Sequence, residues 1–150
     1  MATKVYSPAN GKAIKIEKVP DEMFAQKMIG DGIAIKTNEK ELYSPVEGEV
    51  KMVFETGHAV GVVSDDGSEF MIHIGIDTVQ LNGEPFKTMV KVGDRVTTDT
   101  LISVVDWNCI RKHKKDDSVI IISLNKPVQI LNKQWLFNIK RKDILYETKD

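Results

Sequence analysis

Short stretches of alternating apolar and polar residues run along the whole chain, with glycine, aspartate, asparagine and proline between them. Alternation with a period of two is typical of β-strands that bury one face. The pattern predicts strands at residues 12–17, 32–36, 47–54, 58–64, 69–75, 101–106, 118–124 and 135–140. Short strands with turns between them favour an all-β fold, an antiparallel sandwich or barrel, because no strand–helix alternation interrupts them.

Helical signals are few and short. The segment PDEMFAQKMIG at 20–30 predicts one short amphipathic helix that stops at its glycine. Asp21 stands where an N-cap is expected, and Phe24 and Met28 lie one helical turn apart. Residues 107–117, WNCIRKHKKDD, predict a second, weaker helix or a basic loop.

Two segments of the chain have similar sequences. YSPANGKAIKI at 6–16 and YSPVEGEVKMV at 43–53 share Tyr-Ser-Pro, a glycine three residues later and an alternating strand. Two occurrences are too few for a repeat protein, so we interpret them as the openings of two pseudo-symmetric halves. Because no low-complexity segment or linker separates them, residues 1–150 are expected to form a single domain.

The stretch EFMIHIGIDTVQL at 69–81 places a histidine in the middle of an apolar strand. A period of two divides this stretch into two faces. The apolar face, which the pattern assigns to the core, holds Phe70, Ile72, Ile74 and Ile76. The opposite face holds Met71, His73, Gly75 and Asp77. On this pattern His73 is a packed structural residue, a metal ligand or a group that does chemistry.

A second histidine, His58, opens the preceding predicted strand. If this strand forms a hairpin with 69–75, position 58 lies opposite about 75, and position 73 opposite about 60. The two imidazoles are then diagonal neighbours on adjacent strands. Thr56 and Asp77 are close enough in sequence to add a hydroxyl and a carboxylate to the same patch.

Several chemistries fit such a patch. A neutral imidazole is a nucleophile near neutral pH, and a second imidazole can donate a hydrogen bond to an anion. Two histidines and a carboxylate can bind zinc, and two structural histidines with ordinary partners also fit. The residues alone leave these alternatives open. His113 lies in a charged run and Cys109 has no base near it in the sequence, so surface or structural roles are expected for both.

Composition narrows the class of protein. The chain has 150 residues, of which 41% are hydrophobic and 29% charged, as in a globular domain. A formal net charge of −1 argues against a nucleic-acid-binding protein. The longest apolar runs are too short to insert in a membrane, and no signal peptide is visible. The single cysteine favours a reducing, cytoplasmic setting, and the initiating Met1 favours a free-standing protein.

Four ordered motifs give the chain a family resemblance. They are VPDEMFAQKMIGDGIAIK, SPVEGEV, FETGHAVGV and IHIGIDTVQLNGEPFK. Their order and separations resemble those of the glucose-class enzyme IIA of the bacterial phosphoenolpyruvate-dependent sugar phosphotransferase system. The resemblance extends from about Val5 to Asp106 and more loosely to the end. The sequence departs from the family pattern at Ile74 and Pro85, in 97–102 and after Asp106.

The resemblance implies an antiparallel β-sandwich and a role as phosphocarrier, a phosphotransferase component. His73 matches the histidine that accepts a phosphoryl group from the phosphohistidine of HPr. That histidine passes the group to a cysteine on the IIB domain of a membrane sugar permease, which takes up glucose or a related sugar. His58 matches a histidine that stabilises the phosphoryl group, with Thr56 hydrogen-bonded nearby. Gly75 and Asp77 supply backbone and carboxylate partners for the two rings. We expect the inward nitrogen of His73 to donate to the Gly75 carbonyl.

The resemblance also implies transient partners. An apolar surface around the histidines is expected to dock HPr and the IIB domain, and regulatory target proteins are further candidate partners. The chain itself is expected to be a monomer. The candidates for this surface are Met71, Phe54, Ile33 and Ile35, although ordinary core packing explains the isoleucines and Phe54 equally well. No cofactor is required, and zinc at His58 and His73 would be adventitious or bridging.

Two alternatives remain open at this level. PVEGEVKMV followed by VKVGDRV is similar to the strand pattern of a biotinyl or lipoyl carrier, with Lys51 as the modified residue. That lysine, however, lies inside an alternating strand rather than at a hairpin tip. A zinc-dependent hydrolase of related β architecture needs a closer set of histidines than IHIG offers.

Overall fold

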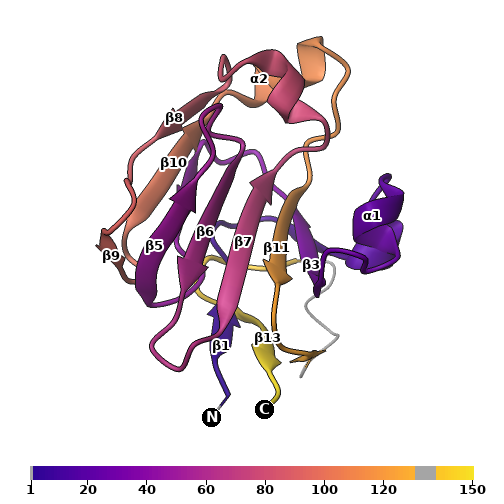
Figure 1. Ribbon diagram of the computed structural model, residues 1–150. Helices are drawn as coiled ribbons and strands as arrows, with labels where there is room; N and C mark the ends of the chain where they lie inside the picture. The colour runs from indigo at the N-terminus through magenta and orange to yellow at the C-terminus, as the bar shows by residue number, and fades with distance from the viewer. Residues whose placement is uncertain (1, 131–137) are drawn as a thin grey trace.

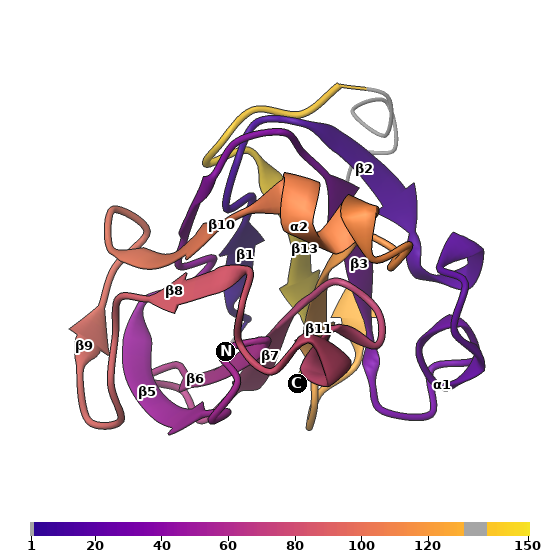
Figure 2. The ribbon, with the colours of Figure 1, turned by 90° about the horizontal axis from the view of Figure 1, so that it is seen from above.

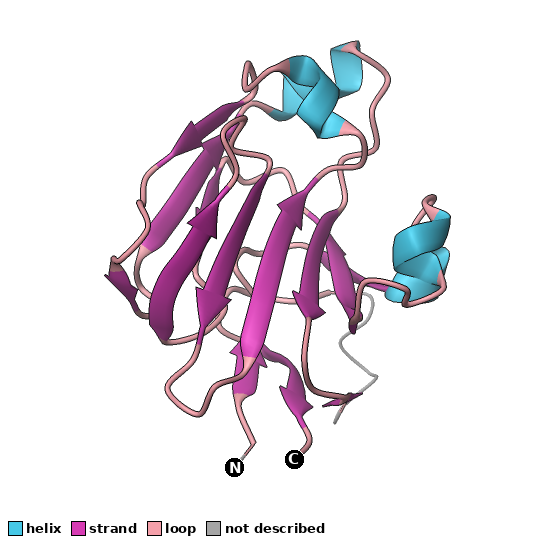
Figure 3. Cartoon of the chain, in the orientation of Figure 1, coloured by secondary structure: helices cyan, strands magenta, loops and turns pink. Residues whose placement is uncertain are grey.

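The computed structural model describes residues 2–130 and 138–150. Almost all of its regular structure is antiparallel β-strand, and two short α-helices and two 3₁₀ turns interrupt the strands (Figure 3). The strands are β1 (Lys4–Tyr6), β2 (Lys12–Lys15), β3 (Asp31–Lys36), β4 (Glu41–Tyr43), β5 (Gly48–Val53), β6 (Ala59–Val63), β7 (Glu69–Ile74), β8 (Phe86–Thr88), β9 (Arg95–Val96), β10 (Leu101–Val105), β11 (Val119–Ser123), β12 (Val128–Gln129) and β13 (Ile144–Thr148). The predicted all-β class is confirmed.

The strands form one large sheet and two small ones. The large sheet has the order β2-β3-β11-β7-β6-β5-β9, and the small sheets have the orders β4-β10-β8 and β1-β13-β12. Figure 1 shows β5, β6, β7 and β11 of the large sheet at the front, and Figure 2, seen from above, shows this sheet curving back through β3 to β2. The predicted antiparallel sandwich is therefore the observed architecture.

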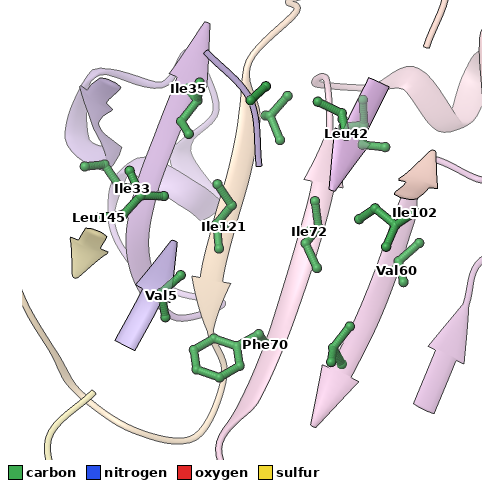
Figure 4. Close-up of a cluster of buried hydrophobic side chains, with 14 of the residues drawn as sticks. Val5, Ile33, Ile35, Leu42, Val60, Phe70, Ile72, Ile102, Ile121 and Leu145 are labelled. Atoms are coloured by element: carbon green, nitrogen blue, oxygen red, sulfur yellow. The ribbon is translucent and has the colours of Figure 1, made fainter. Parts of the chain in front are cut away.

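The main core fills the space between these sheets (Figure 4). Its side chains come from alternate positions of the long strands, because successive residues of a strand point to opposite faces. Fully buried members include Val5, Ile33, Ile35, Leu42, Val60, Phe70, Ile72, Ile102, Ile121 and Leu145.

The helices are shorter than the sequence predicts. Helix α1 covers Glu22–Ala25, and Asp21 caps it by accepting hydrogen bonds from the backbone N–H groups of Met23 and Phe24. The cap is as predicted, but the helix ends early, and Lys27 has a left-handed backbone with a φ of 60°. The predicted apolar face is wrong for Met28, whose exposed fraction is 67%. Helix α2 covers Trp107–Lys112, in the first half of the predicted segment.

Strand predictions hold best where the strands are long. The predicted strand 12–17 ends at Lys15, because residues Ile16–Lys18 form the 3₁₀ turn η1. The sequence missed the short strands β1, β4, β8, β9, β12 and β13. The first half of the predicted strand 135–140 lies outside the described residues, and in its second half Ile139 makes an isolated bridge to Gly11.

The two Tyr-Ser-Pro segments exchange backbone hydrogen bonds. Tyr6 N–H donates to the Pro45 carbonyl at 2.9 Å, and Tyr43 N–H donates to the Pro8 carbonyl at 3.1 Å. Hairpin β2–β3 opens one half and hairpin β5–β6 the other, and they lie on either side of the β11–β7 pair. Ile72 pairs with Ile121 at the centre, so a pseudo-two-fold axis passes between these two residues. The predicted pseudo-symmetric halves are confirmed.

A second apolar cluster lies on the other face of the large sheet. It consists of Ile16, Val19, Phe24, Ala34, Ile76, Ile120 and Ile122, with Ile14, Ile29 and Met71 packed against it. The chain segment from η1 through α1 supplies its cover, and Figures 1 and 2 show α1 outside the sheet, beside β3. This cover reaches the histidine of β7.

Candidate functional site

His73 lies next to the last residue of β7, on the outer face of the large sheet. It pairs with Ile120 of β11 on one side and with Ala59 of β6 on the other. The alternation Phe70-Ile72-Ile74 keeps β7 anchored in the core, so His73 points away from it and is only half-buried. A central strand with neighbours on both sides holds the ring more rigidly than a loop would.

His58 lies one residue before β6, and the predicted hairpin register was wrong by one position. Ala59, not residue 60, pairs with His73, and the Ile74 N–H donates to the His58 carbonyl at 2.7 Å. Because His58 precedes the strand, strand alternation does not fix the direction of its side chain. The two rings nevertheless meet as predicted, with their centroids 5.2 Å apart at an interplanar angle of 76°.

Aromatic side chains enclose the pair of imidazoles. The Phe24 ring lies 4.9 Å from the His73 ring, and the Phe54 ring lies 4.9 Å from the His58 ring, centroid to centroid. His58 is 7% exposed. The pair is therefore a polar patch inside an apolar rim.

The His73 ring is oriented by a backbone carbonyl. Its Nδ1 lies 2.8 Å from the Gly75 carbonyl oxygen, the contact expected from the sequence. A carbonyl can only accept, so Nδ1 carries the hydrogen and Nε2 carries the lone pair. Gly75 makes this turn with a φ of 78°, and a Cβ there would come within 2.4 Å of Thr78 Cγ2.

The strand ends at this turn, which changes the positions of Ile76 and Asp77. The prediction that Ile76 continues the core face of β7 is wrong, because Ile76 packs in the outer cluster with Phe24. Asp77 has a left-handed backbone and precedes the 3₁₀ turn η2 (Thr78–Leu81). Its carboxylate is near enough to raise the pKa of His73.

The hydroxyl of Thr56 orients the second ring. Thr56 Oγ1 lies 2.5 Å from Nδ1 of His58. A hydroxyl can donate or accept, so this contact is compatible with either tautomer of His58. It leaves Nε2 of His58 as the nitrogen that is available to a bound group.

Burial keeps both imidazoles neutral near pH 7. Burial, with a smaller effect from His58, lowers the pKa of His73 to about 4 against the opposing effects of the Gly75 carbonyl, Asp21 and Asp77. Burial also lowers the pKa of His58. A neutral His73 with a lone pair on Nε2 is a nucleophile that needs no base.

The structure separates the four predicted docking residues into two groups. Phe54 and Met71 are half-buried and line an apolar groove of about 100 Å³ beside the histidines. Ile33 and Ile35 are 0% exposed and lie in the main core, so their assignment to a docking surface is wrong. Strand β3 is covered on both faces, and it is Ala34 that shares the outer face with His73.

Sequence reasoning missed two residues of the site, Asp21 and Phe24. Both belong to the helix signal at 20–30, and that local signal does not show that the helix packs on His73. Asp21 is close enough for its charge to raise the pKa of His73. Cys109, in contrast, is buried, and burial raises the pKa of its thiol, as expected for a structural cysteine.

Within 2–130 and 138–150, no group of three or more histidine, cysteine, aspartate or glutamate side chains is placed to hold a metal ion. None of the helices in this part of the chain is long and apolar enough to span a membrane.

Comparison with known proteins decides the family. A sequence model described as phosphoenolpyruvate-dependent sugar phosphotransferase system, EIIA 1, matches residues 3–128. The chain belongs to this family. Among solved structures, the glucose permease IIA from Mycoplasma capricolum is similar to this EIIA protein, with 31% sequence identity and a TM-score of 0.90. The match covers 98% of this chain and 96% of that chain.

Family membership gives the EIIA protein its general role, that of a phosphocarrier in sugar transport by the phosphotransferase system. Neither of the alternatives, a biotinyl or lipoyl carrier or a zinc-dependent hydrolase, is favoured. Phosphoryl transfer asks a protein to position the reacting groups and to stabilise charge. The paired, oriented imidazoles are suited to both tasks.

Proposed function

We propose that His73 is the residue that carries the phosphoryl group, on its Nε2 atom. The observation that supports this most strongly is the contact between Nδ1 and the Gly75 carbonyl, because it leaves the Nε2 lone pair pointing away from the strand. Among the described residues, the ring of His58 has the hydroxyl of Thr56 as its hydrogen-bond partner and no such carbonyl. This difference supports the proposed roles of His73 as the nucleophile and His58 as the supporting residue.

His58 and Thr56 stabilise the transferred group. When the Thr56 hydroxyl donates to Nδ1 of His58, Nε2 of His58 carries the hydrogen. That N–H can donate to a phosphoryl oxygen on the neighbouring His73, whose ring centroid is 5.2 Å away. The two histidines therefore act in opposite tautomers, one as nucleophile and one as hydrogen-bond donor.

The transfer step balances without a metal or an added base. The lone pair on Nε2 of His73 attacks phosphorus, a P–N bond forms, and the P–N bond of the donor phosphohistidine breaks with its electron pair returning to the donor ring. The His73 ring becomes a phosphoimidazolium that keeps its hydrogen on Nδ1. The Gly75 carbonyl then accepts a stronger, charge-assisted hydrogen bond. In the second transfer, a cysteine thiolate displaces the neutral imidazole.

The donor in this proposal is HPr and the acceptor is the IIB domain of a membrane sugar permease that takes up glucose or a related sugar. The family assignment supports both partners, as does the printed name of the Mycoplasma protein. The phosphotransferase reaction would take place in the cytoplasm between monomers of each protein. Zinc at the two histidines would need a further ligand from a partner.

An open apolar groove next to the histidines is suited to docking HPr. Met52, Gly61 and Met71 lie in one row across β5, β6 and β7, and Met52 is 52% exposed. Phe54 lines the same groove and touches His58. The groove is thus continuous with the phosphoryl site, and methionines adapt to partners of different shape.

Phosphate labelling tests this function. The protein is incubated with labelled phosphoenolpyruvate, enzyme I and HPr, and the adduct is expected to be acid-labile and base-stable, with one phosphoryl group on His73. His73→Ala should abolish labelling, and His58→Gln should accept the group but pass it on poorly. His113→Ala is the matched control, because His113 directly follows α2, outside the site, and this variant should label as the wild type does. Labelling that persists in His73→Ala would refute the assignment.

A further inference from the structure

A second layer of hydrogen bonds lies behind the turn that orients His73. The Gly75 N–H donates to the Ser118 carbonyl at 2.7 Å, and the Ile76 N–H donates to the Asp116 carbonyl at 3.0 Å. The Ile76 N–H and the Gly75 carbonyl belong to one peptide group. That group accepts from Nδ1 of His73 on one side and donates to Asp116 on the other.

Asp116 is fixed by its own side chain. Its Oδ1 accepts from the Ser118 N–H at 2.9 Å, and its Oδ2 accepts from Nζ of Lys36 at 3.1 Å. The side chain therefore holds the loop in the shape that presents both carbonyls to the turn. Lys36 is the last residue of β3, so a strand of the large sheet anchors the loop.

A neighbouring aspartate extends these bonds into a clamp, which consists of Asp116, Asp117, Lys36 and Arg111. Asp117 Oδ1 accepts from Lys36 Nζ at 2.6 Å, and Asp117 Oδ2 accepts from Nε of Arg111 at 2.8 Å. Burial opposes the charge of Lys36, yet its bonds to Asp117 and Asp116 raise its pKa above the usual value. The clamp joins β3, α2 and the loop before β11, and it touches neither histidine.

We propose that Asp116, held by Lys36, is a positioning residue for phosphoryl transfer by His73, acting through the Gly75–Ile76 peptide group. The inference rests on the proposed role of His73 as phosphoryl acceptor. When His73 becomes a phosphoimidazolium, its Nδ1–H needs a strong and fixed acceptor. A peptide carbonyl is a better acceptor when the N–H of the same peptide group is itself bonded, because hydrogen bonds in a chain polarise one another.

Removing the clamp should loosen the acceptor without disturbing the docking surface. For Asp116→Ala, transfer from phospho-HPr is expected to slow about tenfold, the size of effect typical of groups that orient a reactive residue, with the KM for HPr unchanged. The ¹⁵N NMR signals of the His73 ring should show a lower fraction of the Nδ1–H tautomer. A variant that only destabilised the fold would not change this tautomer.

Two further variants and one control make the test decisive. Lys36→Met should slow transfer about threefold and shift the tautomer in the same direction. Lys36→Arg should restore the wild-type rate and tautomer, because arginine keeps the bonds to both aspartates. Arg95→Gln breaks an exposed ion pair with Asp65, away from the loop, and should behave as the wild type. Should Asp116→Ala fail to fold by circular dichroism, the Lys36 pair decides.

The outcomes distinguish the positioning role of Asp116 from the role of His73 as phosphoryl acceptor. Suppose that the wild type is labelled on His73, and that Asp116→Ala and Lys36→Met leave the rate and the tautomer unchanged. This result would overturn the positioning role and leave the phosphocarrier assignment intact. A slower rate caused only by a higher KM for HPr would also overturn it, because that result assigns the clamp to docking. Absence of wild-type labelling on His73 would instead refute the proposed acceptor.

Discussion

The two Tyr-Ser-Pro halves of the large sheet are alike in backbone and different in what covers them. In the first half, the outer-face row runs Ile14-Ala34-Ile120 and is closed by the chain's own segment from η1 through α1. In the second half, the corresponding row runs Met52-Gly61-Met71 and is open. One fold therefore provides a covered apolar face and an exposed one side by side.

The difference lies in the hairpin connections. The connection between β2 and β3 is long enough to form η1 and α1, and it brings Phe24 onto His73. The connection between β5 and β6 is short and carries Thr56 and His58. Both connections thus end at the same pair of imidazoles. One half covers the nucleophile, while the other supports the phosphoryl group and leaves room for a partner.

Uncovering the first half should have the largest effect. Phe24→Ala removes a buried ring from the outer cluster and should lower the free energy of unfolding by about 3 kcal/mol. The same change admits water to His73 and should raise its pKa toward the usual value. Chemical denaturation and an NMR titration of His73 measure the two effects. Phe24→Leu, which keeps most of the volume, is the matched control; an unchanged stability in Phe24→Ala would show that α1 is not a real cover.

Filling the second half should affect binding rather than folding. Gly61→Leu places a side chain in the open groove, where a Cβ would lie 3.3 Å from Met52 Cβ. We expect the KM for HPr to rise about tenfold, equivalent to about 1.4 kcal/mol, while the unfolding free energy changes little. Steady-state transfer from phospho-HPr measures this. Gly61→Ala, which reproduces the Ala34 of the first half, should have a smaller effect, and an unchanged KM in Gly61→Leu would place the partner elsewhere.

Acid should reveal the covered histidine through a gradual loss of stability. The pKa of His73 is about 4 in the folded protein and about 6.5 in the unfolded chain, so between these values the unfolded state binds more protons. Stability is therefore expected to fall as the pH decreases from about 6.5 to about 4. Thermal unfolding at a series of pH values measures the slope. The slope should be shallower in His73→Gln, and an equal slope would assign the acid effect to other groups.

The sequence predicted those parts of the molecule whose signals are local or repeated. Long alternating strands, the Asp21 cap and the two Tyr-Ser-Pro openings were all visible, since each depends on neighbouring residues. Strands such as β9 and β12 were missed because two residues cannot show a period. The residues 20–30 predicted one continuous helix, and only the structure shows the left-handed Lys27 that lies beyond its early end.

The site was predicted in its chemistry and missed in its packing. His73, His58 and the Gly75 carbonyl were expected to meet, and they do. Ile33 and Ile35 were placed on the wrong face, because β3 is buried on both sides and its alternation does not say which face is outer. The contacts of Phe24 with His73, and of Asp116 with Ile76, join distant segments. No local pattern records such contacts.

NMR of the phosphorylated protein shows which nitrogen carries the phosphoryl group, and we expect it to be Nε2 of His73. Enriched with ¹⁵N-histidine and phosphorylated through HPr, the protein should show phosphorus coupled to Nε2 of His73, a hydrogen retained on Nδ1, and no phosphorus on His58. Phosphorus on Nδ1 of His73, or on any nitrogen of His58, would contradict the account, because the bond to the Gly75 carbonyl would then not select the nucleophile.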